Sequence, residues 1–348
     1  MTGQPLLSVR QLTTEFQLAD KQVARALEDV SFDVLPGQTI GLVGESGCGK
    51  TTTLMSIMRL LPASGRIVAG HVYFKGTDLF ALSEREMRLH RWKDMSIVFQ
   101  GAMNALNPVM KIDDQIREAI LLHNLMPREA AEKRVGELLE TVGIPHARRD
   151  QYPHQYSGGM RQRGMIAMAL ACSPDLLFAD EPTTALDVMI QAQVLELLKQ
   201  IQKNLGLAIV LVTHDLGVIA EMCDAVVVMY GGKVAEYGPA ELVYNQPQHP
   251  YTQRLLESFP DLSRSIEPSA GSPRRDALSE GQDLATIPGT PPRLNALPPG
   301  CRFSPRCHKS MEICTRVGPD LVDMAAPDSG ARHLAACHLL TGMEITDL

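Results

Sequence analysis

The segment from Gly44 to Thr51, Gly-Glu-Ser-Gly-Cys-Gly-Lys-Thr, constrains this chain more than any other stretch. It fits G-x-x-x-x-G-K-[ST], a pattern in which glycines let backbone N–H groups turn inward around a polyphosphate. The apolar run over residues 39–43 predicts a buried strand before it, and the residues from Thr52 onward have helical character. Strand, loop and helix therefore follow the order of a phosphate-binding loop, which disfavours a chance match in a glycine-rich turn.

The polar residues of this loop have predicted tasks. Lys50 would lie against the β- and γ-phosphates of a nucleotide, and the Thr51 hydroxyl would ligate Mg²⁺. The following helix adds the positive end of its dipole to the same site. The other residues expected to line the phosphate site are Gly44, Ser46, Gly47, Gly49 and Thr52.

Composition limits the remaining choices. With 348 residues and a net charge of −7, the chain is long enough for a real core and lacks the basic field of a dedicated nucleic-acid binder. No apolar run approaches the roughly 20 residues that span a bilayer, and no secretory signal pattern is visible. We therefore expect a cytoplasmic chain whose seven cysteines are free thiols or metal ligands.

The order of apolar segments predicts an α/β fold. Short apolar strands alternate with amphipathic helices, which is typical of a largely parallel sheet covered by helices on both faces. Residues 113–142 carry helical spacing throughout and predict a helical insertion at about 104–156. We expect a nucleotide-binding domain at 1–245 and a C-terminal extension at 246–348, rich in proline and irregular at first, with four cysteines near its end.

Two carboxylates end a predicted strand, at residues 176–181. Because ligands bind at the carboxyl ends of parallel strands, Asp180 would hold Mg²⁺ and Glu181 would accept a proton from the attacking water. Alone, such a pair is more often a solvated strand terminus, but the phosphate loop upstream favours the catalytic interpretation.

A second anion site begins at Ser157-Gly158-Gly159, where Ser157 is placed to cap a helix. A simple kinase or GTPase has no use for a second such site. These residues resemble the signature sequence of ABC-type ATPases. The family's other motifs have counterparts in the same order. Phe16 is placed like the aromatic residue that stacks on adenine, and Gln100 like the Q-loop glutamine. Ala185-Leu186-Asp187 resembles the D-loop, and His214 the switch histidine.

The resemblance covers roughly residues 6–240 and implies an ABC-type ATPase core. In that family two domains pair head to tail around two ATP molecules. One ATP and its Mg²⁺ would be served by Lys50, Thr51, Gln100, Asp180, Glu181 and His214, and the other by Ser157, Gly158 and Gly159. The chain departs from the commonest pattern at Tyr156 and Met160 of the signature and at Gly101 after the Q-loop glutamine.

The C-terminal region points to one branch of the family. His249-Pro250-Tyr251-Thr252, Ile287-Pro288-Gly289 and the segment 299–307 resemble the ATPases of bacterial dipeptide and oligopeptide importers. That resemblance implies two transmembrane permease subunits, a second and non-identical ATPase, an extracytoplasmic solute-binding protein and a peripheral place on the cytoplasmic face of the membrane. Nickel, glutathione and oligosaccharide importers of the same family stay open as alternatives for the cargo.

Four cysteines lie close together in this extension: Cys301, Cys307, Cys314 and Cys337. Their spacing lacks a C-x-x-C pair and by itself is weak support for zinc or for an iron–sulfur cluster. The resemblance to peptide-importer ATPases implies a [4Fe–4S] cluster held by these four thiolates. We expect its role to be structural, because the segment is too rich in proline to build a core of its own. Zn²⁺ remains the alternative, with His308, His333 and His338 as competing ligands.

Two other functions fit the sequence less well. A soluble ABC ATPase acting on DNA or ribosomes is disfavoured by the acidic charge and by the lack of a long coiled-coil insertion. An iron–sulfur redox protein with a regulatory ATPase would need a flavin or second cluster motif, which the sequence lacks.

Overall fold

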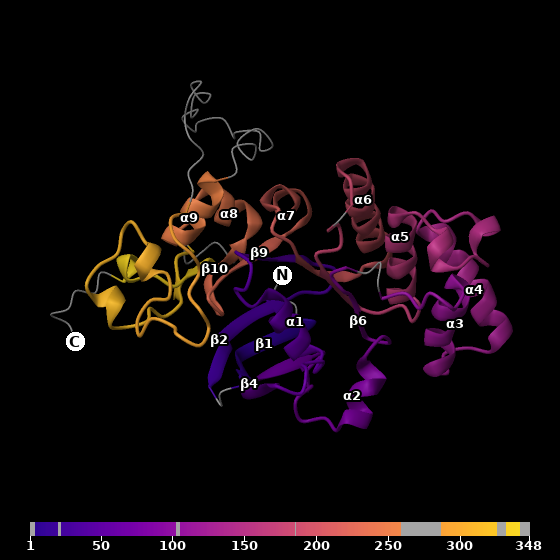
Figure 1. The fold of residues 1–348 in the computed structure, drawn as a ribbon, viewed down its shortest axis with the longest axis horizontal. Helices are drawn as coiled ribbons and strands as arrows, with labels where there is room; N and C mark the ends of the chain where they lie inside the picture. Colours follow the sequence, from indigo (N-terminus) through magenta and orange to yellow (C-terminus); the bar gives the residue numbers. More distant parts are fainter. Residues whose placement is uncertain are drawn as a thin grey trace, which may run out of the picture.

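The computed structural model describes residues 4–19, 22–101, 105–184, 186–258, 287–325 and 332–341. Its backbone is organised around an eight-stranded sheet with the order β11-β12-β10-β9-β3-β8-β7-β6 and a four-stranded sheet with the order β2-β1-β4-β5. Figure 1 shows the helical insertion and the C-terminal extension at opposite ends of the long axis.

Five neighbouring strands of the larger sheet are parallel: β3 (Thr39–Val43), β6 (Met95–Val98), β7 (Leu176–Asp180), β8 (Ala208–Val212) and β9 (Ala225–Tyr230). Every residue of β3, β7, β8 and β9 is buried, which explains why these segments read as unbroken apolar runs. β10 (Lys233–Pro239) pairs antiparallel with β9. The predicted α/β core is thus confirmed.

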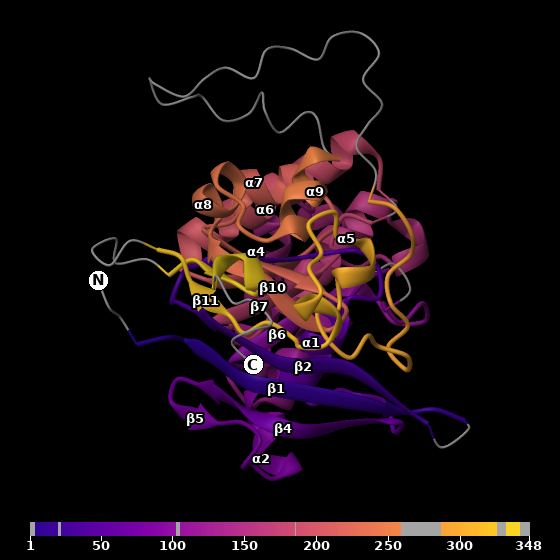
Figure 2. The same ribbon diagram turned by 90° about the vertical axis from the view of Figure 1, so that its left-hand side faces the viewer.

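Successive residues of these strands pack into two separate hydrophobic cores on the two faces of the sheet. One core is shared with the helices that follow the strands, and the other with α1 and the smaller sheet. Figure 2 shows the smaller sheet as the lower layer and the helices as the upper one. The helices of the upper layer are α5 (Gly158–Ala169), α6 (Val188–Leu205), α7 (Leu216–Met222), α8 (Ala240–Asn245) and α9 (Pro250–Glu257), whereas α1 (Lys50–Ile57) lies between the larger and the smaller sheet.

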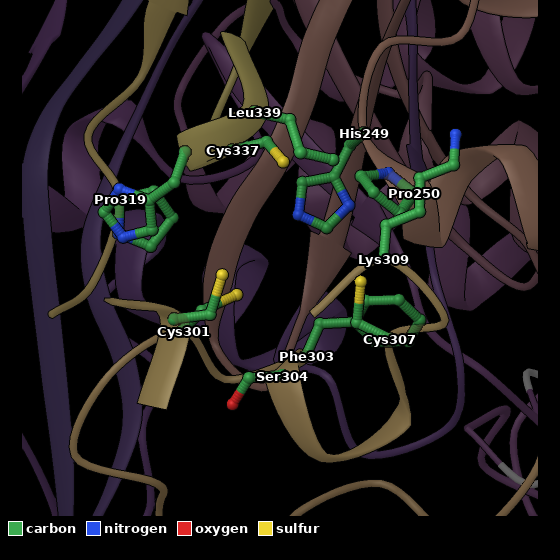
Figure 3. Close-up of a pocket in the computed structure, with 12 residues that line it drawn as sticks. His249, Pro250, Cys301, Phe303, Ser304, Cys307, Lys309, Pro319, Cys337 and Leu339 are labelled. Atoms are coloured by element: carbon green, nitrogen blue, oxygen red, sulfur yellow. The ribbon is translucent and has the colours of Figure 1, made fainter. Parts of the chain in front are cut away.

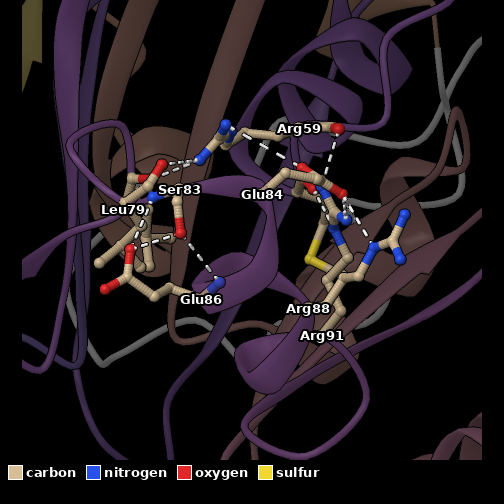
Figure 4. Close-up of polar contacts among 9 residues, drawn as sticks. Arg59, Leu79, Ser83, Glu84, Glu86, Arg88 and Arg91 are labelled. Atoms are coloured by element: carbon tan, nitrogen blue, oxygen red, sulfur yellow. Dashed lines mark hydrogen bonds and ion pairs between the residues drawn. The ribbon is translucent and has the colours of Figure 1, made fainter.

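The smaller sheet is antiparallel and made of β1 (Leu7–Gln17), β2 (Val23–Val34), β4 (Gly65–Phe74) and β5 (Thr77–Asp78). The short helix α2 (Glu84–His90) beside it begins with a capping box between Ser83 and Glu86. Arg91 then joins α2 to the end of α1 by donating to the Met58 carbonyl at 2.8 Å and pairing with Glu84 (Figure 4). These contacts hold α2 against the end of the helix that follows the phosphate loop.

The insertion differs from the prediction in one respect. Residues 113–142 are not one helical stretch, because α3 (Ile112–Leu122) and α4 (Arg128–Thr141) are separated by a five-residue turn. Asn124 takes a left-handed conformation in the turn, and Pro127 is the N-cap of α4. A proline cannot continue a helix from the preceding turn, so the break is encoded locally.

The extension also holds more regular structure than a linker. α9 lies within the part of the extension predicted to be proline-rich and irregular, and β12 (Leu334–Ala335) pairs with β10 near the edge of the larger sheet. β11 (Val322–Asp323) pairs with β12 in turn, and single turns of 3-10 helix occur at η5 (Ser304–Arg306), η6 (Ile313–Thr315) and η7 (His338–Leu340). No helix in the described ranges is long and apolar enough to cross a membrane.

Candidate active site

The predicted catalytic residues converge because their loops follow neighbouring strands. The phosphate loop follows β3, His214 follows β8, Asp180 ends β7 with Glu181 directly after it, and Gln100 follows β6. These four strands lie side by side in the order β3-β8-β7-β6 and are parallel, so their carboxyl ends meet at one edge of the sheet.

Glycine is required at two positions of the phosphate loop. Gly44 and Gly49 have φ values of 145° and 108°. A Cβ on Gly44 would lie 2.2 Å from the Met229 carbonyl oxygen, and one on Gly49 would lie 2.7 Å from a methyl carbon of Leu27. The backbone can therefore approach its neighbours only without side chains at these positions.

Lys50 is buried beneath the loop, and its Nζ donates to the carbonyl oxygens of Gly44 at 2.7 Å and Glu45 at 3.1 Å. Ser46 and Gly47 form the exposed tip. Thr52 lies in the first turn of α1, where main-chain N–H groups point out of the helix start.

Thr51 and Asp180 meet although they lie 129 positions apart, because the Thr51 hydroxyl donates to Asp180 Oδ1 at 3.2 Å. Asp180 is 1% exposed, and its second carboxylate oxygen is buried without a hydrogen-bond partner in the described structure. Burial raises the pKa of this carboxyl group. A hydroxyl beside an unsatisfied carboxylate oxygen is a donor set that suits Mg²⁺.

Glu181 lies at the centre of the polar contacts. Its Oε2 accepts from Gln100 Nε2 at 2.7 Å and from the Thr184 hydroxyl at 2.8 Å, and its Oε1 lies 3.6 Å from His214 Nδ1. Glu181 also has a left-handed backbone with φ of 45°, although its N–H still donates to the Val212 carbonyl. This strained conformation is typical of residues held in place for function.

Ser157 caps α5 as predicted, because its hydroxyl accepts from the Met160 N–H at 3.3 Å. Gly159 packs against Ile190 of α6, since a Cβ there would lie 2.8 Å from that side chain. Among the described residues, no hydrogen bond or ion pair joins the segment 157–159 to the phosphate loop of the same chain.

Phe16 ends β1 and packs over Gly65 of β4, where a Cβ would lie 2.8 Å from its ring. In the predicted D-loop, Asp187 caps α6 through the Ile190 N–H, whereas Ala185 lies outside the described residues. Neither contact bears on a nucleotide directly, so the roles of Phe16 and the D-loop stay predictions.

The extension makes a contact with the phosphate loop that the sequence did not predict. Arg306 forms a two-pronged ion pair with Glu45, and Tyr251 Oη accepts from the Glu45 N–H at 2.9 Å. Tyr251 stands out in the sequence only through a family likeness, and no local pattern singles out Arg306 or Glu45.

The four C-terminal cysteines line one cavity together with His249, Phe303 and His338. Figure 3 shows Cys301, Cys307 and Cys337 around this space. Burial raises the pKa of Cys301 to about 11, and it also raises the pKa values of Cys307 and Cys337. These groups are therefore neutral thiols at pH 7 unless a cation binds them.

The predicted metal at this place is not supported by the geometry. In the described part of the chain, no group of three or more His, Cys, Asp or Glu side chains is arranged to hold a metal ion. The three histidines predicted as competing zinc ligands have other partners: His333 bonds Glu236 at 2.7 Å, His338 bonds the Val317 carbonyl at 2.9 Å and His308 accepts from Arg254.

Comparison with known proteins adds to these observations. The ABC transporter family model matches residues 27–184, and the model of the oligopeptide/dipeptide transporter C-terminal region matches 235–282 and 272–314. The dipeptide transport ATP-binding protein DppD of Bacillus subtilis is 50% identical over 317 residues, covering 90% of each chain. The oligopeptide transport ATP-binding protein OppD of Salmonella typhimurium is 45% identical over 316 residues, covering 90% of this chain and 89% of that one.

Solved structures agree on the fold. A dimeric bacterial ABC transporter cassette superposes with a TM-score of 0.61 at 27% identity, covering 67% of this chain and 98% of that one. A component of a Clostridium perfringens ABC transporter complex, cbiO1, gives a TM-score of 0.60 at 27% identity and covers 70% of this chain and 92% of that one.

Proposed function

The chain belongs to the ATP-binding subunits of ABC transporters, in the oligopeptide and dipeptide branch, and from this premise we propose that Lys50, Asp180 and Glu181 carry its ATP hydrolysis and that the energy drives peptide import. The observation that carries the proposal is the hydrogen bond between Thr51 and Asp180, because it joins the phosphate loop to the strand that ends in the catalytic carboxylates. The relatives that transport dipeptides and oligopeptides support the cargo.

In this proposal Lys50 leaves its loop carbonyls to contact the β- and γ-phosphates. Thr51 and Asp180 would hold Mg²⁺, and Gln100 would be a further ligand. When bound, the ion neutralises charge on the phosphate oxygens. The unsatisfied oxygen of Asp180 supports this assignment.

Glu181 is proposed as the general base. Gln100 and Thr184 orient its carboxylate, so the attacking water would be held on the side that faces His214. His214 is 73% exposed, which leaves its ring free to turn toward the γ-phosphate.

Ser157, Gly158 and Gly159 are proposed to bind the γ-phosphate of a second ATP held by a paired ATPase domain. The capped start of α5 offers main-chain N–H groups to an anion, and no contact ties this segment to the chain's own loop in the described structure. Phe16 is proposed to stack on adenine. The signature segment needs a second domain for its role, which we propose is a non-identical ATPase.

Membrane permease partners follow from the family, and we propose that there are two of them, docked on the α3–α4 insertion at the cytoplasmic face. An extracytoplasmic solute-binding protein would deliver the peptide. The relatives named for peptide transport weigh against the alternatives of a DNA- or ribosome-directed ATPase and of a redox protein.

For the cysteine cavity we propose a [4Fe–4S] cluster rather than zinc. The proposal is supported by the donor type alone: four thiols border one space, whereas the neighbouring histidines are engaged elsewhere. In the described structure the thiols do not form a metal-binding arrangement, so binding would have to draw them together. A bound cluster would cross-link a segment that has few regular elements of its own.

Anaerobic purification of the tagged chain from detergent-solubilised membranes tests the proposal. We expect two membrane subunits and a second ATPase to co-purify, with about four irons per chain and less than one zinc. Cys307→Ser should lose iron, whereas the matched control Cys172→Ser, a buried thiol outside the cavity, should retain it. Recovery of the chain without membrane subunits contradicts the transport role, and zinc without iron contradicts the cluster.

A further inference from the structure

Arg306 connects the cysteine-lined part of the extension to the phosphate loop. It ends the single turn η5, directly before Cys307, and its side chain is only 6% exposed. Its ion-pair partner Glu45 is the second residue of the Gly44–Thr51 loop, 261 positions earlier in the chain.

Every N–H group of this guanidinium has an acceptor. Nε donates to the Pro288 carbonyl at 2.8 Å, and the two terminal nitrogens donate to both carboxylate oxygens of Glu45, to Tyr230 Oη and to the Ile287 carbonyl. Five donors meeting five acceptors form a site that fits arginine and that lysine, with three donors on one nitrogen, cannot reproduce.

Glu45 is also held through its backbone. Its N–H donates to Tyr251 Oη, and Tyr251 is fully buried against Tyr230 and Phe303, with ring centroids 4.7 and 5.3 Å away. The side chain and the main chain of Glu45 are therefore both fixed, by residues of the extension and by Tyr230 at the end of β9.

The effect of this anchoring reaches Lys50. The Glu45 carbonyl accepts from Lys50 Nζ at 3.1 Å, so Glu45 is one hydrogen bond away from the lysine of the loop. A phosphate loop binds tightly when its N–H groups are already aligned, because less ordering is needed on binding.

We propose that Arg306 is a positioning residue for ATP binding, acting through Glu45 to hold the phosphate loop in its binding conformation. This inference rests on the proposed use of the Lys50 loop. All the hydrogen bonds of the Arg306 side chain in the described structure go to Glu45, to Tyr230 and to the carbonyls of Pro288 and Ile287, so we assign it a positioning role. The extension thereby becomes part of the nucleotide site, and its contribution should appear in ATP affinity rather than in the chemical step.

The test measures KM for ATP and kcat of the full transporter complex with Arg306→Gln, Arg306→Lys, Glu45→Gln and the double variant Glu45→Gln/Arg306→Gln. We expect Arg306→Gln to raise KM about tenfold with kcat within about twofold of the parent, as for loss of a charged hydrogen bond. Arg306→Lys should recover only part of the loss. The KM of the double variant should be no higher than that of the single variant with the higher KM, because both substitutions act through one ion pair.

Arg316→Gln is the matched control, since Arg316 forms an exposed ion pair with Glu312 in the same extension and leaves the loop untouched. It should leave KM unchanged. Tyr251→Phe serves if Arg306→Gln does not fold, because it removes only the acceptor of the Glu45 N–H, and a rise in KM of about threefold is expected.

An active parent whose Arg306→Gln variant keeps its KM, or additive losses in the double variant, overturns the inference. A fall in melting temperature with unchanged KM also overturns it, since that is the result of a purely structural contact. An inactive parent complex would instead count against the proposed function.

Discussion

Gln100 and Glu181 are joined by a hydrogen bond of 2.7 Å although 81 positions separate them in the chain. Gln100 follows β6, the last strand of the sheet, and leads toward the helical insertion, while Glu181 directly follows β7. The insertion and the proposed base are thus linked by one side-chain contact. A displacement of the insertion would move Gln100 and leave Glu181 with Thr184 as its hydrogen-bonded partner.

This relationship predicts the effect of Gln100→Ala. The variant removes one of three proposed Mg²⁺ ligands, so Mg-ATP should bind about threefold more weakly. Glu181 also loses one of two orienting donors, so kcat should fall about tenfold. Steady-state hydrolysis and ATP binding, measured on the same complex, separate the two effects. An unchanged kcat would place Gln100 in ATP binding alone.

Asp180→Asn tests the proposed magnesium site. Because burial raises the pKa of Asp180, the ionised carboxylate opposes folding, and stability without nucleotide should be greatest below the ordinary carboxyl pKa and fall as pH rises through the raised value. The neutral amide removes this cost, so the melting temperature at pH 7 should rise by about 2 °C.

With Mg-ATP present, the parent rather than Asp180→Asn should have the higher melting temperature. Mg-ATP should stabilise the parent and leave Asp180→Asn almost unchanged, because the amide is a poor Mg²⁺ ligand. Thermal melts with and without Mg-ATP measure both effects. Equal stabilisation of both proteins by Mg-ATP would contradict the role of Asp180 as a Mg²⁺ ligand.

Ser157→Ala separates helix capping from the proposed role across a dimer interface. The variant loses the cap of α5, which costs about 1 kcal/mol of unfolding free energy. Ser83→Ala, which removes the capping box of α2 seen in Figure 4, should cost a similar amount and is the matched control. Only Ser157→Ala should weaken ATP-driven pairing of the two ATPase subunits, measured by their cross-linking yield. Equal cross-linking yields from the two variants would show that Ser157 acts only as the N-cap of α5.

The sequence predicted the parts of the site that are encoded by short motifs. Lys50, Asp180 and Glu181 each follow or end an apolar strand, and parallel strands bring their carboxyl ends to one edge, so the order of the motifs alone implies that these residues lie close together. The break between α3 and α4 is also encoded locally, in Pro127, but helical spacing on both sides obscured it.

The contacts of the extension could not be inferred in the same way. Arg306 and Glu45 are far apart in sequence, and each looks like an ordinary surface charge until β12 and α9 bring the extension against β10 and the phosphate loop. The cysteines lie between these extremes. Their density suggested a common site, and the structure brings all four to one cavity.

Glu181 is the proposed base for ATP hydrolysis in a membrane-bound importer, and this role is the centre of the account. Its most direct test is the ATP hydrolysis rate of the purified permease complex carrying Glu181→Gln, with nucleotide binding measured in parallel. The amide keeps the size of the side chain but is a far weaker proton acceptor, so hydrolysis should fall by at least about 100-fold while Mg-ATP still binds. Hydrolysis near the parental rate would contradict the account.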